Sequence, residues 1–376
     1  MGVVLVFEPA SDAHWMKDVV QFPNAFSQLI HKTNATLITR PNHKQNELRK
    51  HIKVEYFGNV INENFSNFEY SDFTFSKLVT DKKWYLQACS KASQLGDTLI
   101  LYPWYGDAFK GAQLFKIRCW LRLKRSVVIL KTDGLLREKA ERRASLKEIV
   151  KDYLKFIFID KIICENYHDY DLLQNNQKHL SSKIIFIPNC PLDIYQTNYL
   201  VPYNNREKIF LFVGRIADNE KGADILIENW LKVFNKINGW ILQLVGPCTE
   251  EFKNSWTLRI AEAGADKTVQ WYSSATPEGL LQHYSNARVV ICSSRKESGP
   301  IVLSEAVLSG CAFIGTGVGE IPHLLNGLHG LVNNSDKLSD EILLFGSNDN
   351  IGMEQAIELK KRMGDRKWSE QVKKLL

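Results

Sequence analysis

The chain has 376 residues, of which 44% are hydrophobic and 24% charged, a composition typical of globular proteins that excludes a disordered or collagen-like chain. This length exceeds what one hydrophobic core usually organises, so we expect two domains. The net charge of +6 is unevenly distributed: residues 1–195 contain 28 Lys and Arg against 21 Asp and Glu, residues 196–357 contain 13 against 18, and residues 358–376 contain 7 against 3. A basic first part, an acidic middle and a basic tail indicate regions that meet different partners.

Short apolar segments alternate with amphipathic segments along the chain. The predicted strands cover residues 3–7, 35–39, 98–102, 126–131, 183–188, 208–214, 240–246, 269–272, 289–294 and 311–316. The clearest predicted helices cover residues 223–237, 277–284, 301–308 and 353–362. Many of the strands are apolar on both faces, as is typical of parallel sheets that are covered by helices on both sides. The alternation therefore predicts an α/β fold with doubly wound parallel sheets.

No segment has the character of a membrane span. The longest uncharged stretch, residues 306–319, has 14 residues, whereas a span needs about 18 or more apolar ones. The first residues lack the basic start of a signal peptide, and the seven cysteines form no C-x-x-C pair. We therefore expect a cytoplasmic protein with reduced cysteines.

A change in character near residues 191–205 separates two predicted domains. This stretch contains Pro191 and Pro202 and shows no helical periodicity, as is typical of a linker. We predict a first domain over residues 1–195 and a second over residues 196–357, with a cleft between them. Ligands of open parallel sheets bind beyond the carboxyl ends of the strands, so the chemistry is expected in loops that directly follow strands.

The loop after one predicted strand combines glycine with two cations. Gly214 and Arg215 are followed by Lys221 and Gly222, just before an amphipathic segment. Arginine offers a planar fork for phosphate oxygens and lysine a point charge, while a helix N-terminus favours anions. These residues suit a diphosphate, and the spacing alone leaves open an ordinary loop with two solvated cations.

A second strand-end loop carries two carboxylates eight residues apart, Glu297 and Glu305. Pro300 fits the first turn of a helix, and the backbone N–H groups of Gly299 and Ile301 lie at its start. One carboxylate is suited to sugar hydroxyls and the other to a ribose. The alternative is a capped helix with two surface carboxylates.

Together, these loops resemble the signature of retaining GT-B glycosyltransferases of the family-4 type, also called glycosyl transferases group 1. Glu297 and Glu305 match the E-x7-E motif, and other blocks agree in order over residues 184–335. Those blocks are residues 187–190, 212–215, 221–227, 244–246, 278–287, 305–311, 319–322 and 327–332. The resemblance implies a GT-B fold, in which two Rossmann-like domains face a cleft, and transfer of a sugar from a UDP- or GDP-sugar with retained anomeric configuration.

The resemblance also implies a role for each matched residue. It assigns donor binding to the C-terminal domain, residues 196–357, with Arg215 and Lys221 as catalytic cations on the diphosphate. Glu297 would act on the donor sugar as a further catalytic residue, and Glu305 would bind the ribose. The segment between the carboxylates completes the donor-binding set: Ser298, Gly299, Pro300 and Ile301.

The N-terminal domain, residues 1–195, would bind the acceptor, and the final helix of residues 358–376 would return to it. It departs from the family pattern, because the glycine pair that often follows the first strand is missing. Asp133 follows a predicted strand where relatives often have a histidine, and we predict it as a catalytic residue. The candidates for acceptor binding are His14, Lys17, Asp18, Tyr105 and Asp107. For His14, Lys17 and Asp18 the alternative is a helix start with solvated charges, and for Asp133 it is a type I turn. For the aromatic segment that contains Tyr105 and Asp107 it is packing.

Residues 116–125 contain five cations and no acid, with interleaved Trp and Leu. Such a segment favours an anionic membrane surface. Nucleic-acid binding is a second interpretation of this segment, and a solvated helix face of an ordinary domain is a third. For a glycosyltransferase, a lipid-linked or polyanionic acceptor is favoured over nucleic acid, and peripheral binding at the inner face of the membrane would follow.

We therefore predict a cytoplasmic retaining hexosyltransferase that moves a sugar to a glycan or lipid-linked acceptor in polysaccharide or glycoconjugate biosynthesis. The nucleotide-sugar is a co-substrate, and neither a cofactor nor a metal ion is expected; the nearest acidic pair, Asp169 and Asp171, is expected at the surface. A sugar phosphorylase or epimerase of the same fold is one alternative. The other alternative is a non-catalytic protein that binds glycans or nucleic acid. The presence of both matched cations and both matched carboxylates, Arg215, Lys221, Glu297 and Glu305, weighs against it.

Overall fold

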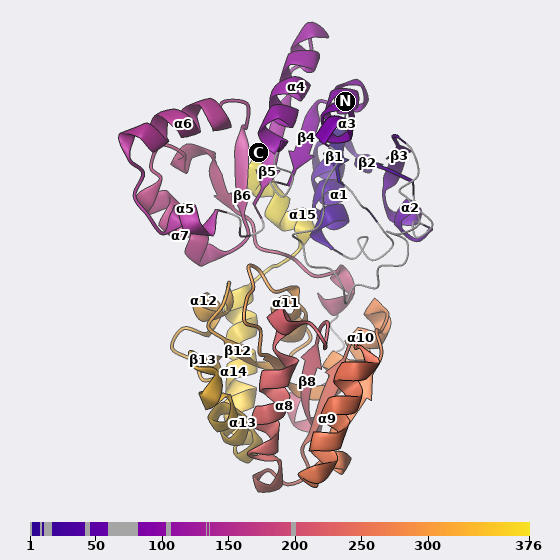
Figure 1. The fold of residues 1–376 in the computed structure, drawn as a ribbon, viewed down its shortest axis with the longest axis vertical. Helices are drawn as coiled ribbons and strands as arrows, with labels where there is room; N and C mark the ends of the chain where they lie inside the picture. Colours follow the sequence, from indigo (N-terminus) through magenta and orange to yellow (C-terminus); the bar gives the residue numbers. More distant parts are fainter. Residues whose placement is uncertain are drawn as a thin grey trace. The chain divides into compact units, whose positions relative to one another are not determined.

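The computed structural model describes residues 2–7, 10, 17–41, 46–58, 82–102, 107–132, 134, 136–196 and 201–376. The described residues form two compact units (Figure 1). Of the described residues, those up to Cys190 and Arg366–Leu376 form the first unit, and those within Pro191–Asp365 form the second. Each unit is built on one parallel β-sheet, which confirms the predicted α/β class with two Rossmann-like sheets.

The described part of the first unit forms seven parallel strands in the order β3-β2-β1-β4-β5-β6-β7. They are β1 (Val3–Val6), β2 (Thr36–Thr39), β3 (Lys53–Tyr56), β4 (Thr98–Leu101), β5 (Val127–Lys131), β6 (Lys161–Cys164) and β7 (Ile184–Phe186). The helices of this unit are α1 (Asp18–His31), α2 (Leu48–His51), α3 (Lys82–Leu95), α4 (Ala108–Leu121), α5 (Arg137–Ala140), α6 (Leu146–Phe156), α7 (Tyr167–Asn176) and α15 (Trp368–Gln371). The strand order reverses between β1 and β4.

The C-terminal residues are part of the core of the first unit. The Trp368 ring of α15 lies 5.7 Å from the Phe22 ring of α1, centroid to centroid, and Val372 and Leu375 are buried in the same cluster. Because apolar side chains fasten this short segment, its return to the first unit rests on hydrophobic burial.

The second unit has six parallel strands in the order β10-β9-β8-β11-β12-β13. They are β8 (Glu207–Val213), β9 (Ile241–Val245), β10 (Val269–Tyr272), β11 (Ala287–Cys292), β12 (Ala312–Thr316) and β13 (Leu331–Val332). Its helices are α8 (Ala223–Leu231), α9 (Glu250–Glu262), α10 (Pro277–Asn286), α11 (Ile301–Leu308), α12 (Ile321–Leu325), α13 (Leu338–Ser347) and α14 (Asp349–Met363). Here the strand order reverses between β8 and β11.

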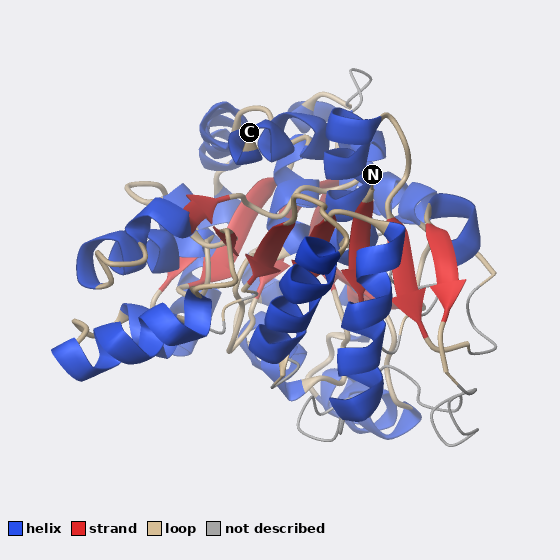
Figure 2. Ribbon diagram, turned by 90° about the horizontal axis from the view of Figure 1, so that it is seen from above, coloured by secondary structure: helices blue, strands red, loops and turns tan. Residues whose placement is uncertain are grey.

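Both faces of the second sheet are buried. Along β8, Phe210 and Phe212 belong to one hydrophobic cluster, while Ile209 and Leu211 belong to another. Successive side chains of a strand point to opposite faces, so the two clusters lie on the two faces of this sheet. Figure 2 shows helices on both sides of the strands. This double burial explains why the strands are apolar throughout.

Two sequence-based predictions of secondary structure need correction. The helix predicted over residues 223–237 ends at Leu231, because Val233, a β-branched residue, has φ −133° and only a short 3-10 turn, Phe234–Lys236, follows. Three strands, β3, β6 and β13, were not predicted. No helix among the described residues is long and apolar enough to cross a membrane.

Candidate functional site

The two predicted donor loops leave neighbouring strands of the second sheet. β8 and β11 pair in parallel, with Phe210 opposite Val289, so the loops that follow them begin side by side. The strand order reverses between these two strands, and ligands of open parallel sheets bind at such a point. The fold therefore brings Lys221 of the first loop to the carboxylate of Glu297 in the second.

Lys221 and Glu297 join the two loops directly. Lys221 Nζ lies 2.6 Å from Glu297 Oε1, and Ser294 donates a hydrogen bond of 2.8 Å from Oγ to the same oxygen. Both partners of the ion pair keep some exposure to solvent, 25% for Lys221 and 12% for Glu297. This carboxylate therefore holds the lysine in position at the end of the sheet.

Arg215 is held in a similar way by its own loop. Its guanidinium lies 2.7 Å from the Asp218 carboxylate, whose Oδ1 also accepts the backbone N–H of Glu220 at 2.8 Å. The ion pair is partly exposed, so its net contribution to stability is small, but it restricts the side chain. Both predicted cations are thus positioned by carboxylates of these loops.

Two glycines allow these loops to approach each other closely. Gly222 has φ +66°, and a Cβ there would lie 2.2 Å from the Ser293 carbonyl oxygen. Gly319 has φ +59°, and a Cβ there would lie 2.2 Å from the Ser298 carbonyl oxygen. Only glycine combines this backbone conformation with so close a contact, so the loop after β12 lies against the loop after β11.

The start of α11 provides groups suited to an anion. Pro300 precedes the helix in an extended conformation, and Ile301 is its first residue. The Ser298 hydroxyl oxygen just before it is buried and has no hydrogen-bond partner in the structure. An unpartnered polar group at a helix N-terminus is suited to phosphate or sugar oxygens.

Glu305 lies within α11 and is largely removed from water. Its Oε2 accepts a hydrogen bond of 2.8 Å from the hydroxyl of the fully buried Tyr284 on α10, whose ring packs edge-on against Tyr195 at 5.7 Å. Burial raises the pKa of Glu305 to about 7, although the hydrogen bond from Tyr284 acts in the opposite direction. This carboxylate therefore changes its charge near neutral pH.

Replacing Glu305 by glutamine is expected to stabilise the ligand-free protein above pH 7 and to change its stability little near pH 5. An acid whose pKa is raised on folding opposes folding increasingly as pH rises from its unfolded to its folded value. Those values are 4.5 and about 7, so the difference at pH 8 reaches roughly 3 kcal/mol. Urea unfolding at pH 5 and pH 8 measures it, with the exposed Glu278 replaced by glutamine as the control. An equal effect of E305Q at both pH values would contradict this assignment.

The first unit contains a buried charge network that the sequence analysis missed. Lys131, the last residue of β5, is fully buried and forms ion pairs with Asp18 Oδ2 at 2.7 Å and with the Glu165 carboxylate. Asn189 Oδ1 lies 3.1 Å from the same ammonium group, and Tyr102 donates a hydrogen bond of 2.9 Å to Asp18. Burial alone would raise the pKa of Asp18, but Lys131 and Tyr102 outweigh it and lower the value.

Of the predicted N-terminal site residues, Lys17, Asp18 and Asp107 are described. Lys17 precedes α1 and Asp18 begins it, and Asp18 turns toward Lys131. Asp107 precedes α4 and pairs with Lys110 at 3.3 Å, so the structure gives it a partner within its own helix. His14, Tyr105 and Asp133 lie outside the described residues.

The surface placement predicted for Asp169 is wrong, whereas Asp171 is exposed as predicted. Asp169 is 2% exposed and lies in the first turn of α7, where Asn166 Oδ1 accepts its backbone N–H at 3.4 Å. Its burial raises the pKa of its carboxyl. Within the described ranges, no three His, Cys, Asp or Glu side chains are grouped so as to hold a metal ion.

The segment that carries both loops matches a known family. Residues 207–348 match the model of the family Glycosyl transferases group 1. This segment lies in the second unit and includes the loops after β8, β11 and β12. No curated protein matches the chain.

Solved structures, a glycosyltransferase among them, are similar to the whole chain. HepE from Anabaena, in complex with UDP, has 15% identity and a TM-score of 0.68, and the match covers 100% of this chain and 99% of HepE. A glycosyltransferase from Rickettsia africae has 14% identity and a TM-score of 0.68, with 99% and 95% covered. Sucrose-phosphate synthase from Thermosynechococcus elongatus has 15% identity and a TM-score of 0.68, with 100% and 97% covered. These likenesses establish the fold, two Rossmann-like parallel-sheet units as in GT-B glycosyltransferases.

Proposed function

We propose that the chain is a retaining glycosyltransferase of the family-4 type, which moves a sugar from a UDP- or GDP-sugar to a glycan or lipid-linked acceptor. The observation that carries this proposal is the joining of the Lys221 and Glu297 loops at the point of strand reversal in the second sheet. That point lies inside the segment that matches the glycosyltransferase family. UDP is favoured as the nucleotide, because solved HepE structures hold UDP and UDP-glucose.

In the proposed reaction the bond between sugar C1 and the phosphate oxygen breaks, and the acceptor oxygen bonds to C1 on the same face. The acceptor proton passes to the departing diphosphate, so the products are the nucleoside diphosphate and the glycosylated acceptor. Negative charge grows on the leaving group in the transition state. Arg215 and Lys221 are proposed to stabilise it, because preorganised donors at developing charge contribute most to such reactions.

The ion pair between Lys221 and Glu297 is compatible with binding of the diphosphate by Lys221. A lysine ammonium has three N–H donors, and Glu297 engages it through one oxygen, so the diphosphate is proposed to bind the remaining donors without displacing the carboxylate. Glu297 would then accept sugar hydroxyls through its other oxygen. Ser298, with its unpartnered hydroxyl, would bind the donor together with Gly299, Pro300 and Ile301.

Glu305 is proposed to accept hydrogen bonds from the donor ribose. In its ionised form it would gain these partners, so binding of a nucleotide-sugar should release a proton near pH 7. The acceptor is proposed to bind the first unit, and Asp133 remains its candidate catalytic residue. We propose that the reaction takes place in the cytoplasm without a metal ion or other cofactor.

A nucleotide panel tests the proposal. UDP, GDP, ADP and the glucose conjugates of each are added in large excess to the purified chain. A ligand present at about one hundred times its dissociation constant stabilises the folded state by about 2.7 kcal/mol. We expect one base to raise the melting temperature by several degrees. Release of its nucleoside diphosphate in the presence of acceptor separates a transferase from an epimerase, which returns a nucleotide-sugar. No shift with any member of the panel would refute the proposal.

A further inference from the structure

Helix α6 of the first unit turns large apolar side chains toward solvent. Leu146, Val150, Tyr153, Leu154 and Ile157 are between 47% and 83% exposed. Their spacing of four, three, one and three residues places them on one face of the helix, within an arc of about 100°. The opposite side of α6 buries only Asp152 and Phe156, so the larger apolar face of this helix points to solvent, whereas ordinary surface helices turn such a face into the core.

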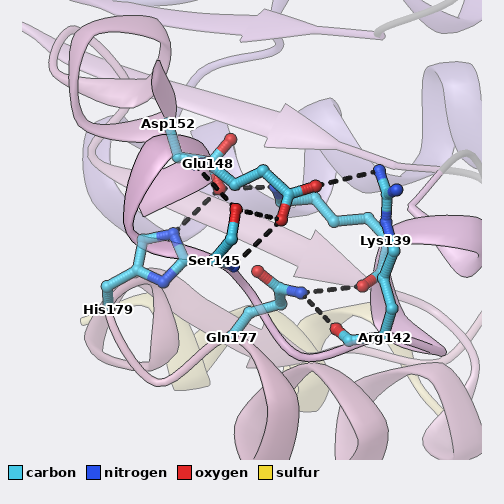
Figure 3. Close-up of polar contacts among 7 residues, drawn as sticks. All are labelled: Lys139, Arg142, Ser145, Glu148, Asp152, Gln177 and His179. Atoms are coloured by element: carbon cyan, nitrogen blue, oxygen red, sulfur yellow. Dashed lines mark hydrogen bonds and ion pairs between the residues drawn. The ribbon is translucent and has the colours of Figure 1, made fainter. Parts of the chain in front are cut away.

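The inward face of α6 is fastened by a polar network (Figure 3). Asp152 is buried and binds Lys139 of α5 and His179 through the same oxygen, Oδ2, with the His179 contact at 2.8 Å. A carboxylate turned inward with two partners fixes the rotation of the helix about its axis. The exposure of the apolar side chains therefore follows from the inward anchoring of Asp152.

The first turn of α6 is fastened as well. Ser145 and Glu148 form a capping box, Arg142 lies 3.2 Å from Glu148, and Gln177 donates hydrogen bonds to the carbonyl oxygens of Lys139 and Arg142 at 2.8 and 2.7 Å. Figure 3 shows these groups gathered at one side of the helix start. Both halves of the helix are thus anchored from the same side.

Cations border the exposed apolar face. Lys147 and Lys151 directly follow it around the helix and are exposed, and neither forms an ion pair within the described part of the chain. Arg143, just before the helix, is exposed as well. Lys155 instead lies over the Phe109 ring at 4.3 Å, so it belongs to the packing against α4.

The outer end of α4 repeats the combination of apolar and basic side chains. Trp120, Leu121 and Leu123 are 72%, 61% and 96% exposed, next to the exposed Arg118 and Arg125. This end lies in the predicted basic segment, residues 116–125.

Helices α4 and α6 belong to one packed structure. The rings of Phe109 and Phe156 meet at 5.0 Å between centroids, and Lys116 of α4 pairs with Asp160, just after α6, at 2.6 Å. Both helices lie along the upper margin of the first unit in Figure 1. A rigid connection therefore holds the two exposed patches in one unit.

We propose that the apolar face of α6, with the outer end of α4, binds the surface of an anionic lipid bilayer. A helix with one apolar face and lysines beside it enters the boundary between headgroups and acyl chains, and basic residues attract acidic lipids. Trp and Tyr side chains favour this boundary. Charge complementarity selects a bilayer over a second copy of the chain, whose matching cations would repel each other. The inference does not depend on the proposed transfer activity.

Vesicle sedimentation with the full chain tests this inference. We expect binding to vesicles of phosphatidylcholine with about one third phosphatidylglycerol, and much weaker binding to phosphatidylcholine alone. The double variant V150E/L154E is expected to lower the partition coefficient more than tenfold. K147Q and K151Q should each lower it about fivefold in low salt, from about 1 kcal/mol per cation.

The matched control is L258E, which changes an exposed leucine of α9 in the second unit and should leave vesicle binding unchanged. Thermal melting of each variant verifies its fold. Equal binding of V150E/L154E and L258E to anionic vesicles would overturn the inference. So would light scattering that shows a dimer lost only in V150E/L154E, because the face would then serve a second copy of the chain.

Discussion

Alanine at Lys221 or at Arg215 is expected to lower the rate of sugar transfer at least a hundredfold while the fold is retained. Each cation is proposed to face the departing diphosphate, and removal of one preorganised donor from a site of developing charge typically costs a factor of about 100 to 1,000. Each side chain is partly exposed, so its loss should cost little stability. The measurement is kcat and KM for the donor that the nucleotide panel identifies.

Two controls make this result specific. Lys221→Ala also leaves Glu297 without its lysine, so K221A is compared with K221A/E297Q, which removes that unbalanced charge. R259A removes an exposed cation of α9, which pairs with Glu228 at 3.6 Å, and should retain full activity. If K221A and R215A transfer sugar as fast as R259A, their proposed role is wrong.

Methionine at Lys131 is expected to destabilise the first unit by about 3–5 kcal/mol, because two carboxylates, Asp18 and Glu165, would be left without their buried cation. Lys131 and Glu165 are buried, whereas the Asp18 side chain is 21% exposed, so water screens the lost interaction with Glu165 least. The loss should shrink as pH falls and Asp18, whose pKa Lys131 lowers, becomes protonated. Urea unfolding at pH 5 and pH 8 measures it, followed by amide exchange in the first unit.

The control is K161M on the neighbouring strand β6, where the lysine is only partly buried and has no ion pair among the described residues. This variant should lose less than about 1 kcal/mol. E165Q added to K131M should restore part of the stability, since it removes one of the two unbalanced charges. Equal stability of K131M and K161M would show that the buried network contributes nothing.

All strands of the second unit except β13 were predicted from the sequence, because most of them are apolar on both faces and β13 has only two residues. Residues such as Phe210 and Leu211 fill cores on opposite faces, and this produces the continuous apolar runs that identify a buried parallel strand. The loops that follow them keep glycines where a Cβ would strike the backbone, as at Gly222. Strand pattern and loop chemistry therefore agree in this unit.

The buried network of the first unit was missed because β6 was missed. This strand has four residues and begins with Lys161, so it lacks the long apolar run that identified its neighbours. Glu165 directly follows it, and without the strand nothing marked that residue as lying at the end of a sheet. The apolar run 162–164, followed by two polar residues, was the available signal. Lys131 gave no signal of its own, since burial of a lysine depends on partners distant in sequence.

The exposed face of α6 could not be recognised from periodicity either. An apolar stripe at helical spacing predicts a face but not the direction in which it points. The direction depends on Asp152, whose partners Lys139 and His179 lie on other elements. Only the folded chain shows that Asp152 and Phe156 point inward while the larger apolar face points to solvent.

Amide hydrogen exchange with and without the stabilising nucleotide-sugar tests the central claim most directly, namely that the donor binds where the strand order of the second sheet reverses. The account predicts slower exchange in residues 214–222, after β8, and in residues 293–301, after β11, because bound ligand would order both loops. The control peptides come from α9, Glu250–Glu262, and should exchange equally in both samples. Nucleotide-dependent protection that lies elsewhere, with both loops unchanged, would contradict the account.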